Sequence, residues 1–365
     1  MGRIAILLPT LDPGGAERVM LNLSHGLVER GHAVDMVLGS AKGAFLPELD
    51  ARIRLVDLAA PRVLQAFPAL VRHLRSERPQ VVISSLPHLN LAAILARSWS
   101  RIRTRLVLVE HGDVTLASVH GLRRWERFFP AAMRLLYPFS DAVVAVSQGV
   151  ADGLVQRAGI PREKITVIHN PIVTPDIPGK AAAALDHPWF KAGGPPVIVA
   201  AGRLTVTKDY PTLLHAFALL RARRAARLMI LGEGEMRAAL EILAISLGIE
   251  ADVELCGFQT NPFAFLGRSA VLALSSTWEG FGNVLVEALA CGTQVVSTDC
   301  PGGPAEILEH GKYGRLVPVG DAPALAAALG EALDAPLPVE MLRERAQAFS
   351  VDAALEKYLH VMGLD

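Results

Sequence analysis

The sequence predicts an α/β protein built from two domains, each with a doubly wound parallel sheet. Short apolar runs rich in Val, Ile and Leu alternate with helical patterns along the chain, which is typical of parallel strands covered on both faces. The chain has 365 residues, too many for one ordinary core. A Pro- and Gly-rich stretch between residues 173 and 196 separates two series of six such runs, which predicts two domains.

A strand is expected wherever a run of Val, Ile or Leu is bounded by turn residues. In the first series the expected strands are Ile4–Leu8, Ala33–Leu38, Val81–Ser84, Leu106–Val109, Ala142–Val146 and Ile165–Ile168. In the second series they are Val197–Ala201, Arg227–Leu231, Val253–Leu255, Val271–Leu274, Val295–Ser297 and Gly314–Val317.

These runs set the expected domain boundaries. Residues 1–172 form the first domain, 173–196 the linker and 197–345 the second domain, and residues 346–365 form a helix that packs back across the junction. Ligands of open α/β sheets bind beyond the carboxyl ends of the strands. The two domains are therefore expected to face each other across a cleft that holds the ligand site.

The net charge of zero conceals an asymmetry between the halves. Residues 1–170 carry 21 Lys and Arg against 14 Asp and Glu, and residues 171–365 carry 15 against 22. This predicts an anionic partner for the first half. No apolar run approaches the roughly 18–20 residues of a membrane span, and the opening strand is followed too soon by acidic residues to be a signal peptide. The three cysteines, which lack metal spacing, are expected to be reduced thiols of a cytosolic protein.

The most informative motif is EGFGNVLVE, which runs from Glu279 to Glu287 and follows an expected strand. It combines a glycine turn with the start of a helix, where the first backbone N–H groups lack internal partners and bind anions. Gly282 lets a phosphate or a sugar approach the main chain, because it has no Cβ. Two carboxylates that flank an anion site suit a nucleotide whose sugar hydroxyls need acceptors, and Glu287 is placed to accept from a ribose.

Two cations, Arg203 and Lys208, follow the first strand of the second series. Together they are able to neutralise a diphosphate. Taken alone they are more simply solvated loop charges, but the EGFGNVLVE motif in the same domain favours binding. Two further turns follow strands of this domain: LGEG contains Gly232, and CGFQTNP contains Phe258. Phe258 is equally consistent with a loop anchor and with a contact for a base.

In the first half, Gly14 and Gly15 open a helix after the first strand. A dinucleotide fingerprint would read Gly-x-Gly-x-x-Gly with an acid closing the second strand. Here the glycines are adjacent and that strand ends in Gly39 and Ser40, so a nicotinamide site is disfavoured.

Basic residues are concentrated in two segments of the first half, Arg97–Arg105 and Arg123–Arg134. Between Gly121 and Tyr137 a helical arrangement places apolar residues on one face and arginines opposite. Such a helix either rests on an anionic membrane surface or packs on the core with a solvated basic face, and the sequence leaves both open. The apolar residues are Trp125, Phe128, Phe129, Ala132 and Leu136, and the arginines are Arg123, Arg127 and Arg134.

An ordered set of motifs resembles glycosyltransferase family 4. In chain order it comprises GGAER, GRL with KDY, LGEG, GF followed by NP, EGFGNVLVEALACGT and CPGGPAEIL. The resemblance covers nearly the whole chain and is densest from Val197 to Gly320. It implies a GT-B fold in which the second domain mainly holds a nucleotide-sugar and the first binds the acceptor.

The resemblance also implies roles for individual residues. Arg203 and Lys208 match the pair that stabilises the departing diphosphate, Glu287 the acid on the ribose, and Glu279 the acid near the donor sugar. The catalytic set is Arg203, Lys208, Glu279 and a histidine beside the donor sugar, His111, with Asp113 a weaker candidate. The donor-binding set is Gly14, Gly15, Arg203, Lys208, Gly232, Phe258, Glu279, Phe281, Gly282, Asn283, Val284 and Glu287.

The implied function is a retaining transfer of a hexose or N-acetylhexosamine from a UDP-sugar to a hydroxyl of a glycan, in particular a lipid-linked saccharide of the cell envelope. No metal or other cofactor is expected, because no Asp-x-Asp motif occurs and the cations are able to replace a metal. No carboxylate nucleophile stands out, so front-side attack is expected. The protein is expected in the cytoplasm, peripherally on the inner face of the cytoplasmic membrane. No nucleic-acid partner is expected. The alternatives are a nucleotide-sugar epimerase of the same fold and a non-catalytic nucleotide-binding protein.

Overall fold

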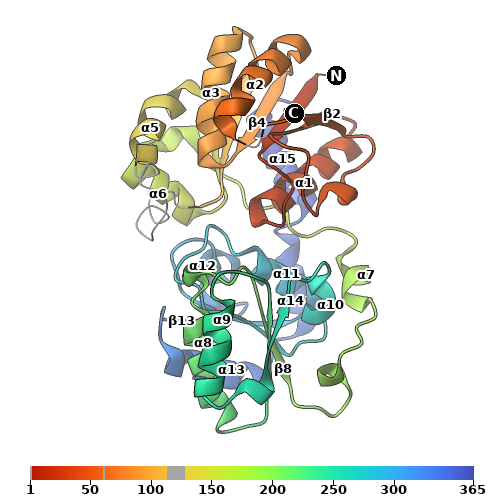
Figure 1. Ribbon diagram of the computed structural model, residues 1–365, viewed down its shortest axis with the longest axis vertical. Helices are drawn as coiled ribbons and strands as arrows, with labels where there is room; N and C mark the ends of the chain where they lie inside the picture. Colours follow the sequence, from red (N-terminus) through yellow and green to blue (C-terminus); the bar gives the residue numbers. More distant parts are fainter. Residues whose placement is uncertain (1, 61, 113–127) are drawn as a thin grey trace. The chain divides into compact units, whose positions relative to one another are not determined.

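The computed structural model describes residues 2–60, 62–112 and 128–365 (Figure 1). The chain forms two compact units, Met1–Ile172 with Val351–Asp365, and Val173–Ser350. Each unit is a parallel sheet flanked by helices (Figure 1). Among the described residues, no helix combines the length and the apolar character that crossing a bilayer requires.

The first unit contains a seven-stranded sheet in the order β3-β2-β1-β4-β5-β6-β7. The strand order reverses between β1 and β4, so the loops after these two strands diverge there, as at the ligand sites of doubly wound sheets. The strands are β1 (Arg3–Leu8), β2 (Ala33–Leu38), β3 (Arg54–Asp57), β4 (Val81–Ser85), β5 (Arg105–Glu110), β6 (Ala142–Ala145) and β7 (Ile165–Val167). The helices are α1 (Gly15–Glu29), α2 (Val63–Glu77), α3 (Pro87–Ser100), α5 (Phe129–Leu136), α6 (Gln148–Ala158) and α15 (Val351–Met362), with the 3₁₀ turn η3 (Tyr137–Phe139).

The second unit contains a six-stranded sheet in the order β10-β9-β8-β11-β12-β13, and its order reverses between β8 and β11. Its core lies between the sheet and helices such as α8 and α13, where Phe217 and Leu329 are fully buried. The strands are β8 (Val197–Ala201), β9 (Arg227–Leu231), β10 (Val253–Gly257), β11 (Val271–Leu274), β12 (Gln294–Thr298) and β13 (Arg315–Val317). The helices are α7 (Ile177–Ala182), α8 (Tyr210–Arg221), α9 (Arg237–Ser246), α10 (Pro262–Leu266), α11 (Asn283–Cys291), α12 (Pro304–Ile307), α13 (Ala322–Asp334) and α14 (Val339–Gln347).

The strand β3 is absent from the sequence-based expectation. It is the edge strand of its sheet, and most of its residues are exposed. A search for continuous apolar runs finds strands that are buried on both faces and misses an edge strand of this kind. Arg54 of β3 pairs with the fully buried Asp35 of β2 at 2.5 Å, and Arg3 of β1 pairs with the same carboxylate. These ion pairs tie the edge strand to the sheet.

The segments at the junction belong to definite units. Residues 173–196, expected to be a linker, lie in the second unit, where α7 packs on α10 and α11. Helix α15 lies in the first unit although the chain reaches it from the second. It packs on α1 and β5, where Arg30 pairs with Glu356 at 2.8 Å and Arg105 donates to the carbonyl of Val361.

Candidate functional site

The strand-order reversal of the second unit brings together two loops that are far apart in the sequence. One loop follows β8 and contains the 3₁₀ turn η6 (Val206–Lys208), and the other follows β11. The N–H of Thr277 donates to the carbonyl of Thr207 at 2.9 Å, and the hydroxyl of Ser275 donates to the carbonyl of Lys208 at 2.8 Å. These bonds fix the main chain of Lys208 against the second loop.

The side chains of Lys208 and Glu279 form an ion pair between these loops. The Lys208 Nζ lies 2.5 Å from the Glu279 Oε1, and the Ser276 hydroxyl donates to the same oxygen at 2.7 Å. The two side chains are 23% and 11% exposed, so the pair is only partly solvated and is stronger than a surface pair. Sequence reasoning assigned Lys208 and Glu279 to different parts of the ligand; in the structure they are direct partners. Sequence reasoning also did not identify Ser276 as a site residue.

Helix α8 begins at Tyr210, two residues after Lys208. Asp209 is its N-cap, and the Asp209 carboxylate accepts from the N–H of Thr212 at 3.4 Å and from the Thr212 hydroxyl at 2.7 Å. A Pro at the start of the helix adds a preset backbone angle. The cap therefore fixes the start of the helix next to Lys208, which directly precedes the N-cap residue.

Arg203 lies in the same loop as Lys208. Its side chain is exposed and has no ion pair or hydrogen bond among the described residues. A guanidinium in this state is available to bind a phosphate in two-pronged fashion.

The glycine loop after β12 packs directly on the loop that carries Glu279. The N–H of Glu279 donates to the carbonyl of Pro301 at 3.0 Å. A Cβ on Gly302, whose φ is +118°, would lie 1.7 Å from the carbonyl oxygen of Glu279. Only glycine permits this contact, so Gly302 controls the position of Glu279.

The variant Gly302→Ala is expected to lose at least about 1 kcal/mol of unfolding free energy through its backbone angle, and more through the clash with Glu279. Gly311→Ala is the matched control, because its φ is +102° and nothing lies within 4 Å of the added Cβ. Urea denaturation of both variants measures the difference. Equal stability of the two variants would contradict the close packing described here.

Helix α11 begins directly after Gly282, which adopts a left-handed φ of +97° as its N-cap. The ring of Phe281 is buried against Phe349 at a centroid distance of 5.5 Å, so only the main chain of Phe281 is offered to a ligand. Asn283 and Val284 in the first turn of α11, and Glu287 one turn later, are half-buried.

The two other predicted turns of the second unit lie beside the β8 loop. The N–H of Gly232 donates to the carbonyl of Gly257 at 2.8 Å, and the N–H of Leu204 donates to the carbonyl of Glu233 at 2.9 Å. Phe258, directly after β10, is exposed. A residue that anchored this loop in the core would be buried, so Phe258 is not such an anchor, and its contact with a base stays a prediction.

In the first unit, Gly14 and Gly15 form the start of α1, with Gly14 as the N-cap. The Glu17 side chain folds back toward this helix start, and a Cβ on Gly14 would lie 2.1 Å from its Oε2. The glycine therefore leaves room for the Glu17 carboxylate, and a contact of Gly14 with a ligand stays a prediction.

His111 follows β5 and is half-buried. Its Nε2 has no hydrogen-bond partner among the described residues. Burial lowers the pKa of His111 to about 4, because a charged ring is disfavoured away from water. The imidazole is therefore neutral near pH 7.

A buried carboxyl group that sequence reasoning missed precedes His111. Glu110 is fully buried, and its Oε1 accepts hydrogen bonds from the Tyr137 hydroxyl and from the Asn90 Nδ2, the latter at 2.7 Å. Its Oε2 has no partner among the described residues. Burial raises the pKa of Glu110 to about 7. An acid that ends an otherwise apolar strand is the sequence signal that would have identified it.

The predicted basic helix is described only in part. Arg123, Trp125 and Arg127 of this helix lie outside the described residues, as does the separate catalytic candidate Asp113. In the described part, Phe128 was expected on the same face as Ala132 and Leu136, but it precedes α5 and is exposed, and Met133 supplies the buried contact instead. The predicted helical face upstream of Phe128 lies outside the described residues, so the arrangement expected from Gly121 onward stays a prediction.

No group of three or more His, Cys, Asp or Glu side chains within residues 2–60, 62–112 and 128–365 is arranged to hold a metal ion. The three cysteines are free thiols, and burial raises their pKa to about 12.

In the second unit the Lys208–Glu279 pair, Arg203 and the start of α11 lie on the loops that follow β8 and β11, where the strand order reverses. Ligand sites of doubly wound α/β proteins lie at such a reversal. Residues 13–175 match the family model for Glycosyltransferase Family 4, and residues 184–349 match the model for glycosyl transferases group 1. The chain belongs to glycosyltransferase family 4 and has the two Rossmann-like units of the GT-B fold.

Two relatives and one solved structure illustrate this membership. The chain is 30% identical to the N-acetylgalactosamine-N,N'-diacetylbacillosaminyl-diphospho-undecaprenol 4-alpha-N-acetylgalactosaminyltransferase of Campylobacter jejuni, over 87% of each chain. It is 30% identical to the lipopolysaccharide core biosynthesis glycosyltransferase LpsE of Rhizobium meliloti, over 96% of each. Anabaena HepE, solved in complex with UDP and glucose, has a similar fold with a TM-score of 0.79 at 20% identity over the full length of both chains.

Proposed function

We propose that this chain is a retaining, metal-independent glycosyltransferase that moves a hexose or N-acetylhexosamine from a UDP-sugar to a hydroxyl of a lipid-linked saccharide in cell-envelope glycan assembly. The observation that carries the proposal is the Lys208–Glu279 pair at the strand-order reversal, next to the available guanidinium of Arg203. The Campylobacter relative is named for a diphospho-undecaprenol substrate, and HepE was solved with UDP. On this basis we place the enzyme on the inner face of the cytoplasmic membrane.

The donor's diphosphate is bound by Arg203 and Lys208 and by the main chain at the start of α11, from Gly282 to Val284. Glu287 accepts hydrogen bonds from the ribose hydroxyls. The Glu279 carboxylate holds the Lys208 ammonium in place and accepts from a hydroxyl of the donor sugar. Fixed cations that already point at the leaving group stabilise its charge without reorganisation.

The reaction breaks the bond between the anomeric carbon and the diphosphate oxygen. The acceptor hydroxyl attacks the same face of that carbon, and its proton passes to the departing diphosphate oxygen, so the anomeric configuration is retained. The Glu279 carboxylate is a poor nucleophile because its Oε1 already accepts from Lys208 and Ser276. The neutral imidazole of His111 accepts or donates a hydrogen bond at a sugar hydroxyl.

Purified protein incubated with a panel of UDP-sugars and a polyprenyl-diphosphate saccharide is expected to release UDP only when the acceptor is present. The product is expected to keep the donor's anomeric configuration by NMR, and EDTA is expected to leave turnover unchanged. An inverted product, or loss of turnover in EDTA that manganese restores, would overturn this mechanism. Consumption of the UDP-sugar without acceptor would indicate an epimerase instead, and binding of UDP without any consumption would indicate a non-catalytic protein.

A further inference from the structure

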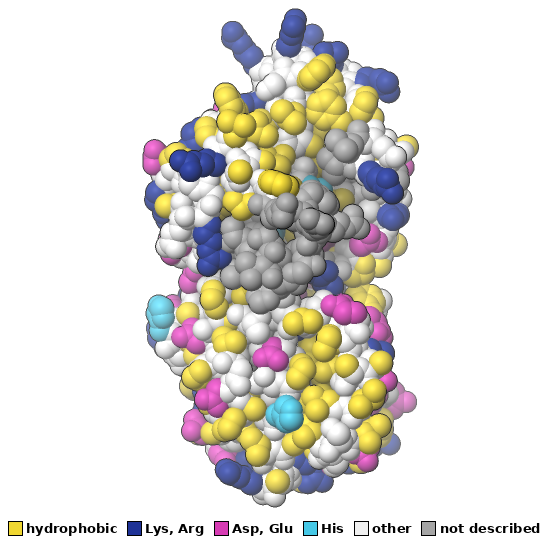
Figure 2. Space-filling view, turned by 60° about the vertical axis from the view of Figure 1, so that its left-hand side comes forward, with side chains coloured by type: hydrophobic (Ala, Val, Ile, Leu, Met, Phe, Trp, Pro, Cys, Tyr) yellow, Lys and Arg dark blue, Asp and Glu magenta, His cyan; other side chains and the backbone are white. Residues whose placement is uncertain are grey.

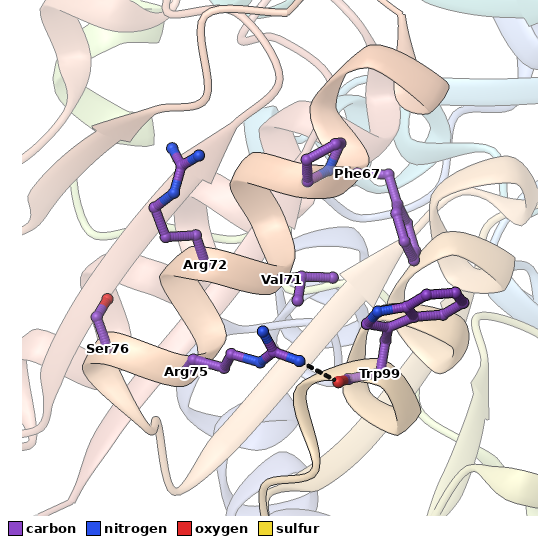
Figure 3. A pocket seen from close by; sticks show the side chains of 7 residues that line it. Phe67, Val71, Arg72, Arg75, Ser76 and Trp99 are labelled. Atoms are coloured by element: carbon purple, nitrogen blue, oxygen red, sulfur yellow. Dashed lines mark hydrogen bonds between the residues drawn. The ribbon is translucent and has the colours of Figure 1, made fainter.

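Helices α2 and α3 of the first unit pack side by side and leave an open pocket of about 690 Å³ on the surface (Figure 3). Trp99, near the end of α3, forms one wall and is 67% exposed. Its ring meets the edge of Phe67 at a centroid distance of 6.2 Å and an angle of 86°. Arg75 donates to the Trp99 carbonyl at 2.7 Å, as Figure 3 shows. The tryptophan is thus held at the surface and is not folded into the core.

Leu95 lies one helical turn before Trp99 on α3 and is also exposed. Residues four apart lie on the same helix face. The two side chains therefore form an apolar ridge along α3. We use the name Trp99 face for the surface formed by Trp99, Leu95, Phe67, Arg72, Arg101 and Arg103.

Three arginines of the Trp99 face are not used by the fold. Arg72 of α2, and Arg101 and Arg103 after α3, are exposed, and their side chains have no ion pair or hydrogen bond among the described residues. Arg101 and Arg103 line a second open pocket, of about 610 Å³, in the turn that follows Trp99.

The acids near the Trp99 face are already paired. Asp141, in the second pocket, pairs with Arg97 at 2.5 Å, and Glu77, at the end of α2, pairs with Arg54 at 2.6 Å. The unpaired charge of this surface is therefore positive. On the face shown in Figure 2, the upper unit likewise carries many dark blue Lys and Arg side chains around apolar ones.

An exposed tryptophan ridge bordered by unpaired arginines fits the interface of an anionic bilayer. The indole ring has an apolar body and a polar N–H, and it is enriched where hydrocarbon meets water. Guanidinium groups bind phosphates in two-pronged fashion. The negative surface potential of anionic lipids attracts such clusters. Large exposed apolar side chains rimmed by charge mark interaction sites more often than ordinary surface.

We propose that the Trp99 face docks onto a membrane of anionic phospholipid, with Trp99 and Leu95 at the interface and Arg72, Arg101 and Arg103 on lipid phosphates. This inference deepens the proposed function, because it gives the enzyme a way to reach a lipid-linked acceptor. It rests on residues that take no part in donor binding or in sugar transfer.

Vesicle sedimentation tests the proposal with the full-length protein. The wild type is expected to bind vesicles of phosphatidylcholine with 30% phosphatidylglycerol, to bind pure phosphatidylcholine much less, and to lose binding in high salt. Arg101→Glu with Arg103→Glu is expected to reduce binding by about tenfold or more, because each charge reversal replaces attraction by repulsion. Trp99→Ala is expected to reduce binding by several-fold.

The second unit offers matched controls for charge and for apolar exposure. Arg223→Glu reverses an exposed arginine, and Ile245→Ala removes a side chain of a residue that is 63% exposed. Both controls are expected to bind vesicles as the wild type does. Wild-type protein that fails to bind the anionic vesicles, or Trp99-face variants that bind as well as the wild type, would overturn the proposal.

Two further measurements, fluorescence quenching and UDP release, distinguish a loss of docking from a loss of folding or of catalysis. Brominated lipids are expected to quench tryptophan fluorescence of the wild type and to quench that of Trp99→Phe much less, because the variant lacks the indole at the interface. Phe at position 99 keeps an apolar contact with Phe67, so the variant is expected to stay folded. Equal quenching in both proteins would contradict insertion of Trp99. UDP release with a water-soluble acceptor analogue is expected to be unchanged in all Trp99-face variants. A wild type that binds vesicles but never releases UDP would refute the proposed function and leave the docking surface intact.

Discussion

Replacing Lys208 by Met is expected to lower kcat for sugar transfer by on the order of 100- to 1000-fold, because removing one preorganised charge partner costs about 3–4 kcal/mol of barrier. The Lys208 ammonium is held by Glu279 at 2.5 Å, and the Ser275 hydroxyl donates to the main-chain carbonyl of Lys208. It therefore needs little rearrangement when the diphosphate departs. Steady-state kinetics with varied UDP-sugar measures the effect, and the loss is expected in kcat more than in KM, since the charge grows only in the transition state.

The single substitution also leaves the Glu279 carboxylate without its ion-pair partner. A partly buried charge that loses its partner is destabilising, so Lys208→Met alone mixes a loss of stability with a loss of catalysis. The double variant Lys208→Met with Glu279→Gln removes both charges and is expected to recover thermal stability but not activity.

Lys312→Met is the matched control for this experiment. It removes a lysine that pairs with Glu309 at 3.0 Å in the same unit, away from the two loops. Its activity is expected to equal that of the wild type. If Lys208→Met kept wild-type turnover, the fixed-cation mechanism would be wrong.

The second large effect concerns the buried carboxyl of Glu110. Burial raises its pKa from 4.5 to about 7 in the folded chain, whereas the unfolded chain releases this proton near the ordinary value. The folded state therefore keeps a proton that the unfolded state has lost, and stability falls as pH rises between these two values. The total loss is on the order of 3 kcal/mol, since each pKa unit corresponds to about 1.4 kcal/mol.

Glu110→Gln removes this ionisation and retains an oxygen that accepts from Tyr137 and Asn90. The free energy of unfolding of the wild type, taken relative to that of Glu110→Gln, is expected to be larger at pH 5 than at pH 8 by about 3 kcal/mol. Urea denaturation at both pH values measures it. Glu163→Gln, at an exposed position of the same unit, is expected to show no such change. An identical difference at both pH values would mean that Glu110 does not carry a raised pKa.

The doubly wound architecture follows from local patterns. Strands such as Ile4–Leu8 and Val271–Leu274 are fully buried, and strands buried on both faces appear in the sequence as continuous apolar runs. The edge strand β3 has no such run, so the sequence did not reveal it.

The candidate site was only partly visible in the sequence. The glycine turns mark where the backbone approaches a ligand, and they placed Arg203, Lys208 and Glu279 near the ends of strands. The ion pair between Lys208 and Glu279 was not evident, because the two residues are 71 positions apart. The pairing depends on β11 lying next to β8 although β9 and β10 come between them in sequence.

The sequence by itself determined the class of fold, the two series of strands and the residue types available for binding a nucleotide, because apolar periodicity and glycine spacing are local properties of a chain. Only the tertiary structure decided which charges neutralise one another, which arginines stay unpaired and why Glu110 is buried. These depend on neighbours that the sheet order and the helix packing bring together, as α3 and η3 bring Asn90 and Tyr137 to the end of β5.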